Sequence, residues 1–385
     1  MASAMFATIA MAEPIDLNQA KLLAKPYIKE TSAQPALVKK SSAAEANQPI
    51  YIFSRGKGQG FVIVSGDDAF PSILGYAESG DFIEDQMPPQ LLAFLETYRG
   101  MIVEASNKHL PAFVNATATD KQDIAPLIKT HWHQNEPYNL RCPMITGTNN
   151  RSIVGCVATA ASQVIYYFHK DAANVMQGTT PTYSYGDAPV TEHITAGTPL
   201  KWDLMLNSYS SEPQEYRDAV ATFCFAVGAG TWLTYGSSTG GHIADLPATF
   251  SNYFGLTGKH MYMSSTTQAG WENRIYDELQ NGRPMVFSGY TSDWKIGHAI
   301  VLDGYQKNGN LFHFNFGWGG QADGYYTIVD GRGPGDYGTG QEIVYNIAPK
   351  KYNLIGEKLG ENILYRSRTN ALSFTVANNM AFTSL

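Results

Sequence analysis

A single cysteine stands where a Gly- and Asn-rich loop gives way to the most clearly amphipathic stretch of the chain. Cys156 follows Gly155, and apolar residues then recur at spacings of three and four as far as Phe168. This spacing predicts a helix with Cys156 in its first turn. Because a helix N-terminus offers unpaired N–H groups and the positive end of the helix dipole, we expect the pKa of the Cys156 thiol to be lowered. The pattern indicates a nucleophile, and a buried, inert cysteine is the alternative.

A nucleophilic cysteine needs a base within hydrogen-bond reach and a group that holds this base in one tautomer. His298 opens a predicted strand beside Gly297 and lies 298 − 156 = 142 positions after the cysteine. This separation is within the window of about 130–150 residues that is typical of one large class of Cys-His enzymes. His298 is therefore the predicted base, and a structural histidine on the same strand is the alternative.

The pair Asn308-Gly309 predicts a hairpin turn between strands at 297–305 and 311–316. In that register the paired positions sum to 617, which places His298 opposite Gly319 and beside Trp318. Asn315 then lies roughly 13 Å from His298 at the usual strand rise. We expect Trp318 to orient the imidazole, with Asn315 as a second candidate if a bulge shortens the path.

Two further segments could face a substrate. Gln134 could stabilise an oxyanion together with the backbone N–H of the nucleophile. The polar, Gly-rich run 234–242 suits a substrate-facing loop but equally an ordinary surface turn. The residues predicted to contact substrate are Tyr235, Gly236, Ser237, Ser238, Gly240 and Gly297. No metal is expected, since His131 and His133 lack a third ligand at zinc spacing and Asp67-Asp68 suits a turn at a hairpin end.

Composition limits the class of protein. With 385 residues, 44% of them hydrophobic, the chain can build one large core or two domains. A net charge of −7 without a Lys/Arg block argues against a nucleic-acid or anionic-membrane partner. No apolar stretch is long enough for a membrane span. Three cysteines, Cys142, Cys156 and Cys224, are too few for a disulfide framework and leave at least one thiol free or paired between chains.

The chain divides into four parts. Residues 1–12 are interpreted as a signal remnant or a tag, because Ala10-Met11-Ala12 has the form of a signal-peptidase site but a positive n-region is missing. Residues 13–120 form an α+β unit with predicted helices at 16–27 and 88–104 and strands at 50–53 and 61–65. The second unit, 121–350, has predicted helices at 156–168, 214–228 and 271–280 and strands at 284–290, 297–305, 311–316 and 324–329. Residues 351–385 are a tail or the start of a truncated C-terminal domain.

Several motifs together resemble the streptopain family of secreted bacterial cysteine proteases. In the second unit they are Trp132-His-Gln134, Gly155-Cys156-Val157-Ala158-Thr159-Ala160, Tyr235-Gly236-Ser237-Ser238, Gly297-His298-Ala299 and Asn315-Phe316-Gly317-Trp318-Gly319-Gly320. The first unit resembles the prodomain of that family at 61–68 and 71–76. Phe316 departs from the pattern, because relatives often carry a second Trp there.

The resemblance implies an α+β fold in which an inhibitory prodomain precedes a papain-like domain of two subdomains. Its nucleophile would be Cys156 and its base His298, with Gln134 and the Cys156 N–H as oxyanion hole. Trp318 would orient or shield the histidine. The family is made as a zymogen, and we expect cleavage between 112 and 125, with Lys121-Gln122 the best bond. The run 330–341 resembles its mobile loop near the active site.

No cofactor is implied. The expected partners are protein or peptide substrates and the chain's own prodomain, and the expected location is extracellular or on a bacterial cell surface. Two other functions stay open: a different Cys-His acyl-transfer enzyme, such as an amidase or transglutaminase, and an inactive papain-like binding module. Cleavage of protein and of the linker at 112–125 would exclude the first. Intact Cys156, His298 and Gln134 argue against the second.

Overall fold

The computed structural model describes residues 10–29, 37–39, 50–113, 120–290, 297–328 and 339–350. Most of the N-terminal segment interpreted as a signal remnant or tag, the tail 351–385 and most of the predicted loop 330–341 lie outside these ranges. No helix among the described residues is long and apolar enough to cross a membrane.

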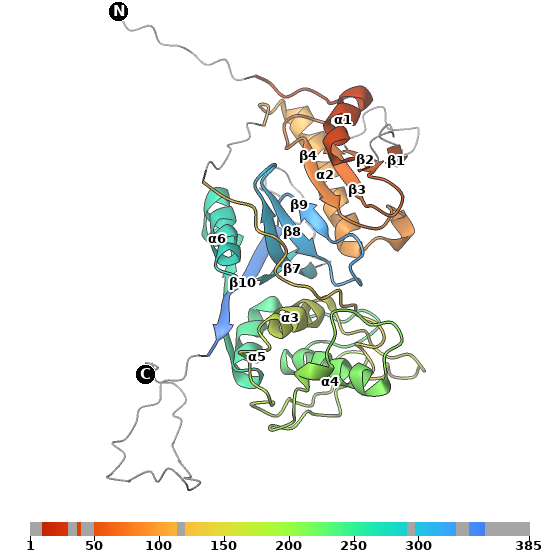
Figure 1. The fold of residues 1–385 in the computed structure, drawn as a ribbon, viewed down its shortest axis with the longest axis vertical. Coiled ribbons are helices and arrows are strands. Elements are labelled where there is room, and N and C mark those ends of the chain that lie inside the picture. The colour runs from red at the N-terminus through yellow and green to blue at the C-terminus, as the bar shows by residue number, and fades with distance from the viewer. Residues whose placement is uncertain are drawn as a thin grey trace, which may run out of the picture.

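The first unit consists of strands with helices on both faces (Figure 1). Its helices are α1 (Leu17–Ala24) and α2 (Pro89–Lys108), and its strands are β1 (Leu37–Lys39), β2 (Ile50–Ser54), β3 (Phe61–Ser65) and β4 (Ile73–Ala77). Alternate residues of β2 enter different cores: Ile50 and Ile52 pack with α2, whereas Tyr51 and Phe53 pack with α1. Because both faces are covered, these strands are apolar throughout rather than alternating.

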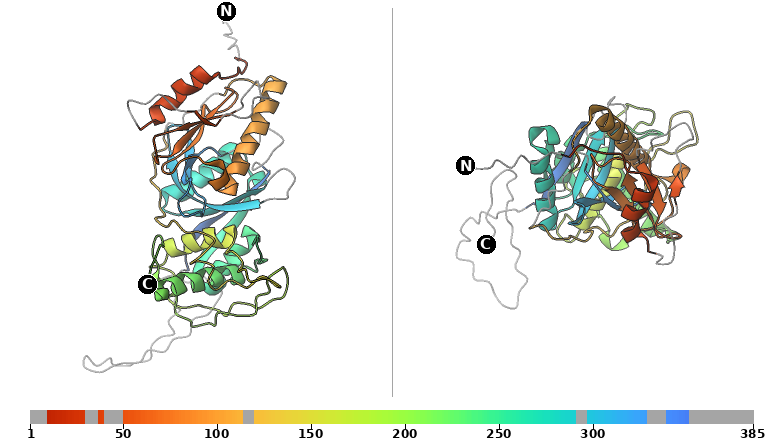
Figure 2. Two further views of the ribbon diagram at one scale, coloured as in Figure 1. Left: turned by 90° about the vertical axis from the view of Figure 1, so that its right-hand side faces the viewer. Right: turned by 90° about the horizontal axis from the view of Figure 1, so that it is seen from above.

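The second unit combines a helical half with a sheet half. Its helices are α3 (Cys156–Tyr167), α4 (Gln214–Gly230), α5 (Leu246–Tyr253) and α6 (Gln268–Gln280), and its strands are β5 (Leu256–Tyr262), β6 (Met285–Tyr290), β7 (Gly297–Gln306), β8 (Leu311–Asn315), β9 (Gly324–Tyr326) and β10 (Thr339–Pro349). The sheet lies against α3, and α4 lies beyond it (Figure 2). Alternate residues of β7 again separate the cores, since Ala299 and Val301 pack with the helical half while Ile300 and Leu302 pack with α2 and α6.

One ten-stranded sheet runs through both units, in the order β1-β2-β3-β4-β9-β8-β7-β6-β10-β5. The join is the antiparallel pair β4–β9, in which Gly75 faces Tyr326 and Ala77 faces Gly324. The N–H of Thr327 continues the contact by donating to the carbonyl of Leu74 at 2.9 Å. The first unit is therefore attached to the second through a sheet edge.

The register predicted for the hairpin after His298 is correct near the turn and shifts farther away. Gln306 faces Leu311 and Gly304 faces His313, so these positions sum to 617 as predicted. A bulge between Leu302 and Gly304 reduces the sum to 616, and Asn315 faces Val301. The bulge moves Asn315 one position closer to His298 than the unbroken register places it.

The predicted helices and strands are present, with boundary shifts of a few residues. The helix predicted at 16–27 is shorter, since α1 ends at Ala24 and a 3-10 turn follows. The helices predicted at 88–104 and 271–280 are longer, as α2 continues to Lys108 and α6 begins at Gln268. Strands β1, β4, β5 and β10 and helix α5 were not among the predicted elements.

Candidate active site

Cys156 is the first residue of α3, as the apolar spacing predicts. Gly155 precedes it with φ of +87°, and a Cβ there would lie 2.9 Å from the carbonyl oxygen of Thr239. Glycine is needed at this position, because a side chain would meet both a strained backbone and a neighbouring loop. All three cysteines are free thiols, but Cys142 and Cys224 are buried. Cys156 keeps part of its surface exposed.

A cleft of about 720 Å³ opens at this helix start and brings together residues from distant parts of the chain. Cys156, His298, Gln134 and Trp318 all line it. Pro89, from the first turn of α2 in the first unit, also lines it. The two halves of the second unit and the first unit therefore meet at one cavity.

The pKa of the Cys156 thiol differs from the sequence-based expectation, and the pKa of His298 is also shifted. Burial raises the pKa of the Cys156 thiol, and this effect exceeds the opposing influence of the backbone amides of Ala299, Val157 and Cys156 itself. The expectation of a lowered pKa was therefore wrong for this state of the protein. Burial also lowers the pKa of His298 to about 4. Both groups are neutral at pH 7 here, and a reactive thiolate requires a change in their surroundings.

Trp318 is held in the cleft by a neighbour from the opposite half. The ring of His133 lies edge-on to it with ring centroids 5.0 Å apart. Gly319 anchors the same turn, because its N–H donates to the carbonyl of Trp132 at 3.0 Å. The β7–β8 pairing ends at Val301 and Asn315, so His298 is not paired with Gly319 as the predicted register implies, and within the described residues it faces Gly289 of β6 instead. Trp318 and His298 line the same cleft.

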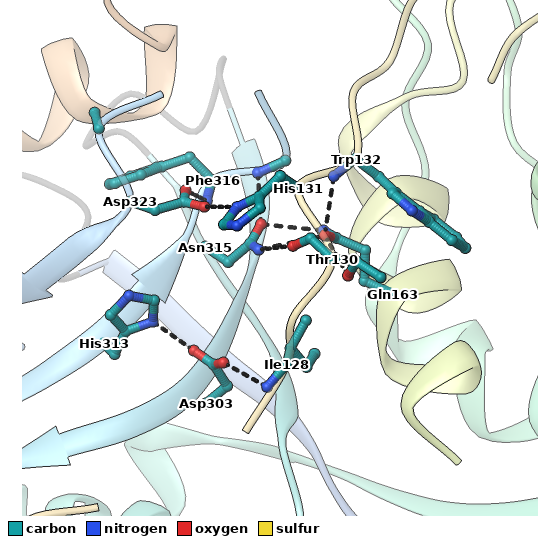
Figure 3. A network of polar contacts seen from close by, with 12 residues as sticks. Ile128, Thr130, His131, Trp132, Gln163, Asp303, His313, Asn315, Phe316 and Asp323 are labelled. Carbon is teal, nitrogen blue, oxygen red and sulfur yellow. Dashed lines mark hydrogen bonds and ion pairs between the residues drawn. The ribbon is translucent and has the colours of Figure 1, made fainter. Parts of the chain in front are cut away.

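Asn315, the second candidate for support of His298, is not among the residues that line the cleft. Its amide nitrogen donates to the carbonyl of Thr130 at 2.9 Å and its oxygen accepts from the N–H of Gly317 at 3.0 Å (Figure 3). It also exchanges hydrogen bonds with the side chain of Gln163. These contacts use all the donors and acceptors of its amide to connect β8, α3 and the segment before Gln134.

A second pair of polar contacts lies beside this network (Figure 3). The ring of His313 contacts Asp303 at 2.6 Å, and the N–H of Ile128 donates to the same carboxylate at 2.9 Å. Asp323 accepts from the N–H of Phe316 at 2.9 Å and lies 3.5 Å from the ring of His131. The first of these contacts joins β7 and β8 to the segment at Ile128, and the second joins the turn after β8 to the segment at His131. None of these residues lines the cleft.

Only some of the residues predicted to contact substrate line the cleft. Ser237, Ser238, Gly240 and Gly297 line the cleft, but Tyr235 and Gly236 do not. Tyr235 is only 1% exposed and packs so closely on α4 that a Cβ at Gly228 would lie 2.1 Å from its hydroxyl. The prediction that Tyr235 contacts substrate was wrong, because its ring belongs to the core.

Four further cleft residues belong to the run 234–242, which the sequence indicates as a possible substrate-facing loop: Thr234, Thr239, Gly241 and His242. Other cleft residues were not predicted from the sequence, and these are Ile153, Val157, Tyr185, Trp232, Asp245, Ser288, Tyr290 and Ala299. Thr239 has the clearest local function, since its hydroxyl donates to the carbonyl of Ile153 at 2.8 Å and so holds the loop against the segment before Cys156. Sequence spacing does not reveal the unpredicted cleft residues, because they come from several separate segments of the chain.

The bond predicted as the best cleavage site is held against the second unit. The ammonium group of Lys121 lies over the rings of Tyr276 and Tyr305, at 5.0 and 5.5 Å from their centroids. The N–H of Gln122 donates to the hydroxyl of Tyr276 at 2.8 Å. Cleavage there would first require these contacts to open.

Comparisons with known proteins match both units. The model of the "Peptidase C10 family" matches residues 132–326, and that of the "Spi protease inhibitor" matches residues 12–102. Streptopain from Streptococcus pyogenes is 31% identical over 322 residues, which cover 77% of each chain. The thiol protease/hemagglutinin PrtT from Porphyromonas gingivalis is 28% identical over 378 residues, covering 88% of this chain but 42% of PrtT.

Two solved structures are also similar. A fragment of prointerpain A from Prevotella intermedia has a TM-score of 0.70 and 28% identity, covering 83% of this chain and 99% of the fragment. Active wild-type interpain A from the same organism has a TM-score of 0.51 and 30% identity, covering 58% of this chain and 94% of the other.

Proposed function

The chain belongs to the Peptidase C10 family, and we propose that it is a cysteine endopeptidase zymogen in which Cys156 is the nucleophile and His298 the base. The observation that carries this assignment is the single cleft lined by Cys156, His298, Gln134 and Trp318. Nucleophile, base and an oxyanion donor are the groups that acyl transfer to a thiol requires.

The proposed reaction begins when the Cys156 thiolate attacks a peptide carbonyl. The side-chain amide of Gln134 and the backbone N–H of Cys156 stabilise the oxyanion that forms. Protonated His298 then gives its proton to the leaving amine, which leaves a thioester on Cys156. A water molecule gives a proton to His298 and hydrolyses this thioester, which releases the acid and restores the Cys156 thiolate and the protonated His298. Trp318 shields the imidazole during both steps.

Latency is proposed to come from the first unit, which matches an inhibitor family. We assign residues 13–120 to the prodomain and 121–350 to the catalytic domain. Pro89 reaches the cleft, and in this form the thiol and the imidazole are both neutral. Maturation is proposed to cut between 112 and 125, a window in which residues 114–119 lie outside the described part of the chain. Lys121-Gln122 is the proposed bond, and the contacts of both residues must open before it is cut. The proposed location is extracellular.

The test compares the purified chain with its Cys156→Ala variant. Size is followed on gels, and the new N-terminus is identified by sequencing. We expect the wild type to shorten by about 12–13 kDa, since a residue averages about 110 Da, and to hydrolyse casein. The variant should stay whole. If both stay whole, and neither acts on casein after an added protease has removed the first unit, the endopeptidase assignment fails.

A further inference from the structure

Two large aromatic side chains lie exposed at the rim of the cleft. The side chain of Trp232 is 51% exposed and that of Tyr185 is 40% exposed, and both line the cavity that contains Cys156. Exposed aromatic side chains that lie close together are uncommon on the surface of a globular domain, and they mark places where a ligand binds. Neither residue has a role in the proposed reaction.

The backbone at Trp232 is held in a conformation that favours glycine. The N–H of Trp232 donates to the carbonyl of Ala229 and the N–H of Leu233 to that of Gly228, both at 3.1 Å. These two bonds close a Schellman motif at the end of α4, and its left-handed position is usually glycine. Trp232 occupies it with φ of +59°. A bulky residue at positive φ is a genuine outlier, and such strain gathers at functional sites.

The two exposed rings are fixed by a buried third ring. Tyr183 stacks on Tyr185 with centroids 4.6 Å apart and on Trp232 with centroids 5.2 Å apart. The hydroxyl of Tyr183 donates to the carbonyl of Leu233 at 2.8 Å, and that of Tyr185 donates to the carbonyl of Trp232. The exposed surface of Trp232 and Tyr185 is therefore pre-organised, and a ligand would not have to order it.

A carboxylate lies beside these rings. Asp245 is the only Asp or Glu among the described residues that line the cleft, and no Lys or Arg is among them. Its charge reaches Tyr185, whose pKa is raised first by burial and then by the Asp245 carboxylate. Asp245 is exposed, and among the described residues no cation pairs with it. The rim of the cleft therefore combines aromatic faces with one uncompensated negative charge.

We propose that Trp232, Tyr185 and Asp245 form a substrate subsite that takes an arginine or lysine side chain. A guanidinium group stacks on an indole or phenol ring and can pair with a carboxylate at its edge. The strained turn at Trp232 then has a function, since it presents the indole to the cleft. This subsite rests on the proposed endopeptidase function.

The test uses the mature enzyme and peptides with a fluorophore and a quencher on either side of one scissile bond. Arginine is moved through successive positions around that bond, and each peptide has a partner with citrulline, the uncharged analogue, at the same position. At one position we expect kcat/KM to favour arginine by about fivefold, the size of an exposed ion pair combined with a cation–π contact. This ratio should fall as the salt concentration rises.

Two variants test whether the preference for arginine depends on the subsite. Asp245→Asn removes the charge, and Trp232→Gly removes the ring while it keeps the left-handed turn. Each should bring the arginine-to-citrulline ratio close to one. Asp218→Asn, an exposed carboxylate on α4 that does not line the cleft, should leave the ratio as it is in the wild type.

Several results would overturn the subsite. One is a wild type that cleaves the peptides but shows no arginine preference at any position. Another is an Asp245→Asn enzyme that keeps the wild-type ratio. A wild type that cleaves neither these peptides nor casein would instead remove the endopeptidase function, and the subsite with it.

Discussion

The side-chain amides of Gln163 and Asn315 are paired reciprocally, with Gln163 donating at 3.1 Å and Asn315 donating at 3.3 Å. Gln163 is fully buried on α3, two turns after Cys156, and Asn315 ends β8. The pair therefore links α3, which begins at Cys156, to the sheet that carries His298. Gln163 also accepts from the hydroxyl of Thr130 at 2.8 Å, on the segment that leads to Gln134.

Gln163→Leu should lower both stability and catalytic efficiency, because the buried amide of Asn315 loses its two hydrogen bonds to Gln163. We expect a loss of about 1–3 kcal/mol in the free energy of unfolding, measured with urea on a Cys156→Ala background. In the mature enzyme kcat/KM should fall by about tenfold or more as the nucleophile shifts. The matched control is Gln177→Leu, at an exposed position, which should stay within about 0.5 kcal/mol. Equal stability of the two variants would show that the amide pair is not a structural link.

The segments that could be predicted from sequence are those whose signal is local. The helix after Cys156 follows from apolar spacing alone, and the hairpin follows from Asn308-Gly309 and two flanking apolar strands. The bulge before Gly304 could not be predicted, because it arises where the segment at Ile124 packs across β7. A Cβ at Gly304 would lie 3.0 Å from the carbonyl oxygen of Ile124.

The remaining differences come from long-range contacts. The direction of the Cys156 pKa shift depends on burial by chain far away in sequence, which a helix N-terminus does not reveal. Tyr235 lies in a polar, Gly-rich run that is typical of a surface loop, yet its ring packs against Gly228 in the core. The β4–β9 join, which makes one sheet of two units, pairs residues about 250 positions apart. None of these contacts is accompanied by a periodic pattern in the sequence that could reveal it.

The reactivity of Cys156 should change when the first unit leaves. In the uncleaved chain the raised pKa of the thiol and the lowered pKa of His298 leave both groups neutral at pH 7. We therefore expect slow alkylation by iodoacetamide that is still increasing with pH at pH 9. The mature enzyme should react faster near pH 7, because an exposed Cys-His pair favours the thiolate. Rates are read by mass spectrometry of the Cys156 peptide in each species, with buried Cys142 and Cys224 as internal references. Identical pH profiles for the two species would contradict this account.

The pair His313 and Asp303 should make stability depend on pH. Burial alone would lower the pKa of His313, but the charge and the hydrogen bond of Asp303 outweigh burial and raise it. A histidine with a raised pKa in the folded state contributes stability that is complete below its unfolded pKa of about 6.5. That contribution is lost as pH rises through the folded value. Urea unfolding of the Cys156→Ala chain from pH 5.5 to 9 should show this loss, and His313→Gln should flatten it. A wild type that gains stability relative to His313→Gln as pH rises would reverse the sign and refute the assignment.

A substitution at the β4–β9 join should weaken the attachment of the first unit to the second without changing Cys156 or His298. A Cβ on Gly75 would lie 2.3 Å from the ring of Tyr326 and 2.8 Å from the carbonyl oxygen of Tyr325, both in the second unit. Gly75→Ala must therefore push β4 away from β9, and we expect autoprocessing several times faster than in the wild type. Gly100→Ala is the matched control, because a Cβ there meets nothing within 4 Å and a helical alanine is favourable.

The rate is measured on gels under identical conditions for both variants and the wild type. Circular dichroism of each variant on a Cys156→Ala background establishes that the chain is folded before processing begins. Because Gly75 lies in β4, which does not line the cleft, a faster cut in a folded chain reports weaker attachment of the first unit rather than altered chemistry. Equal rates for Gly75→Ala and Gly100→Ala would mean that the sheet edge does not hold the first unit in place and that its attachment depends on the packing of α2 against β8 and β9.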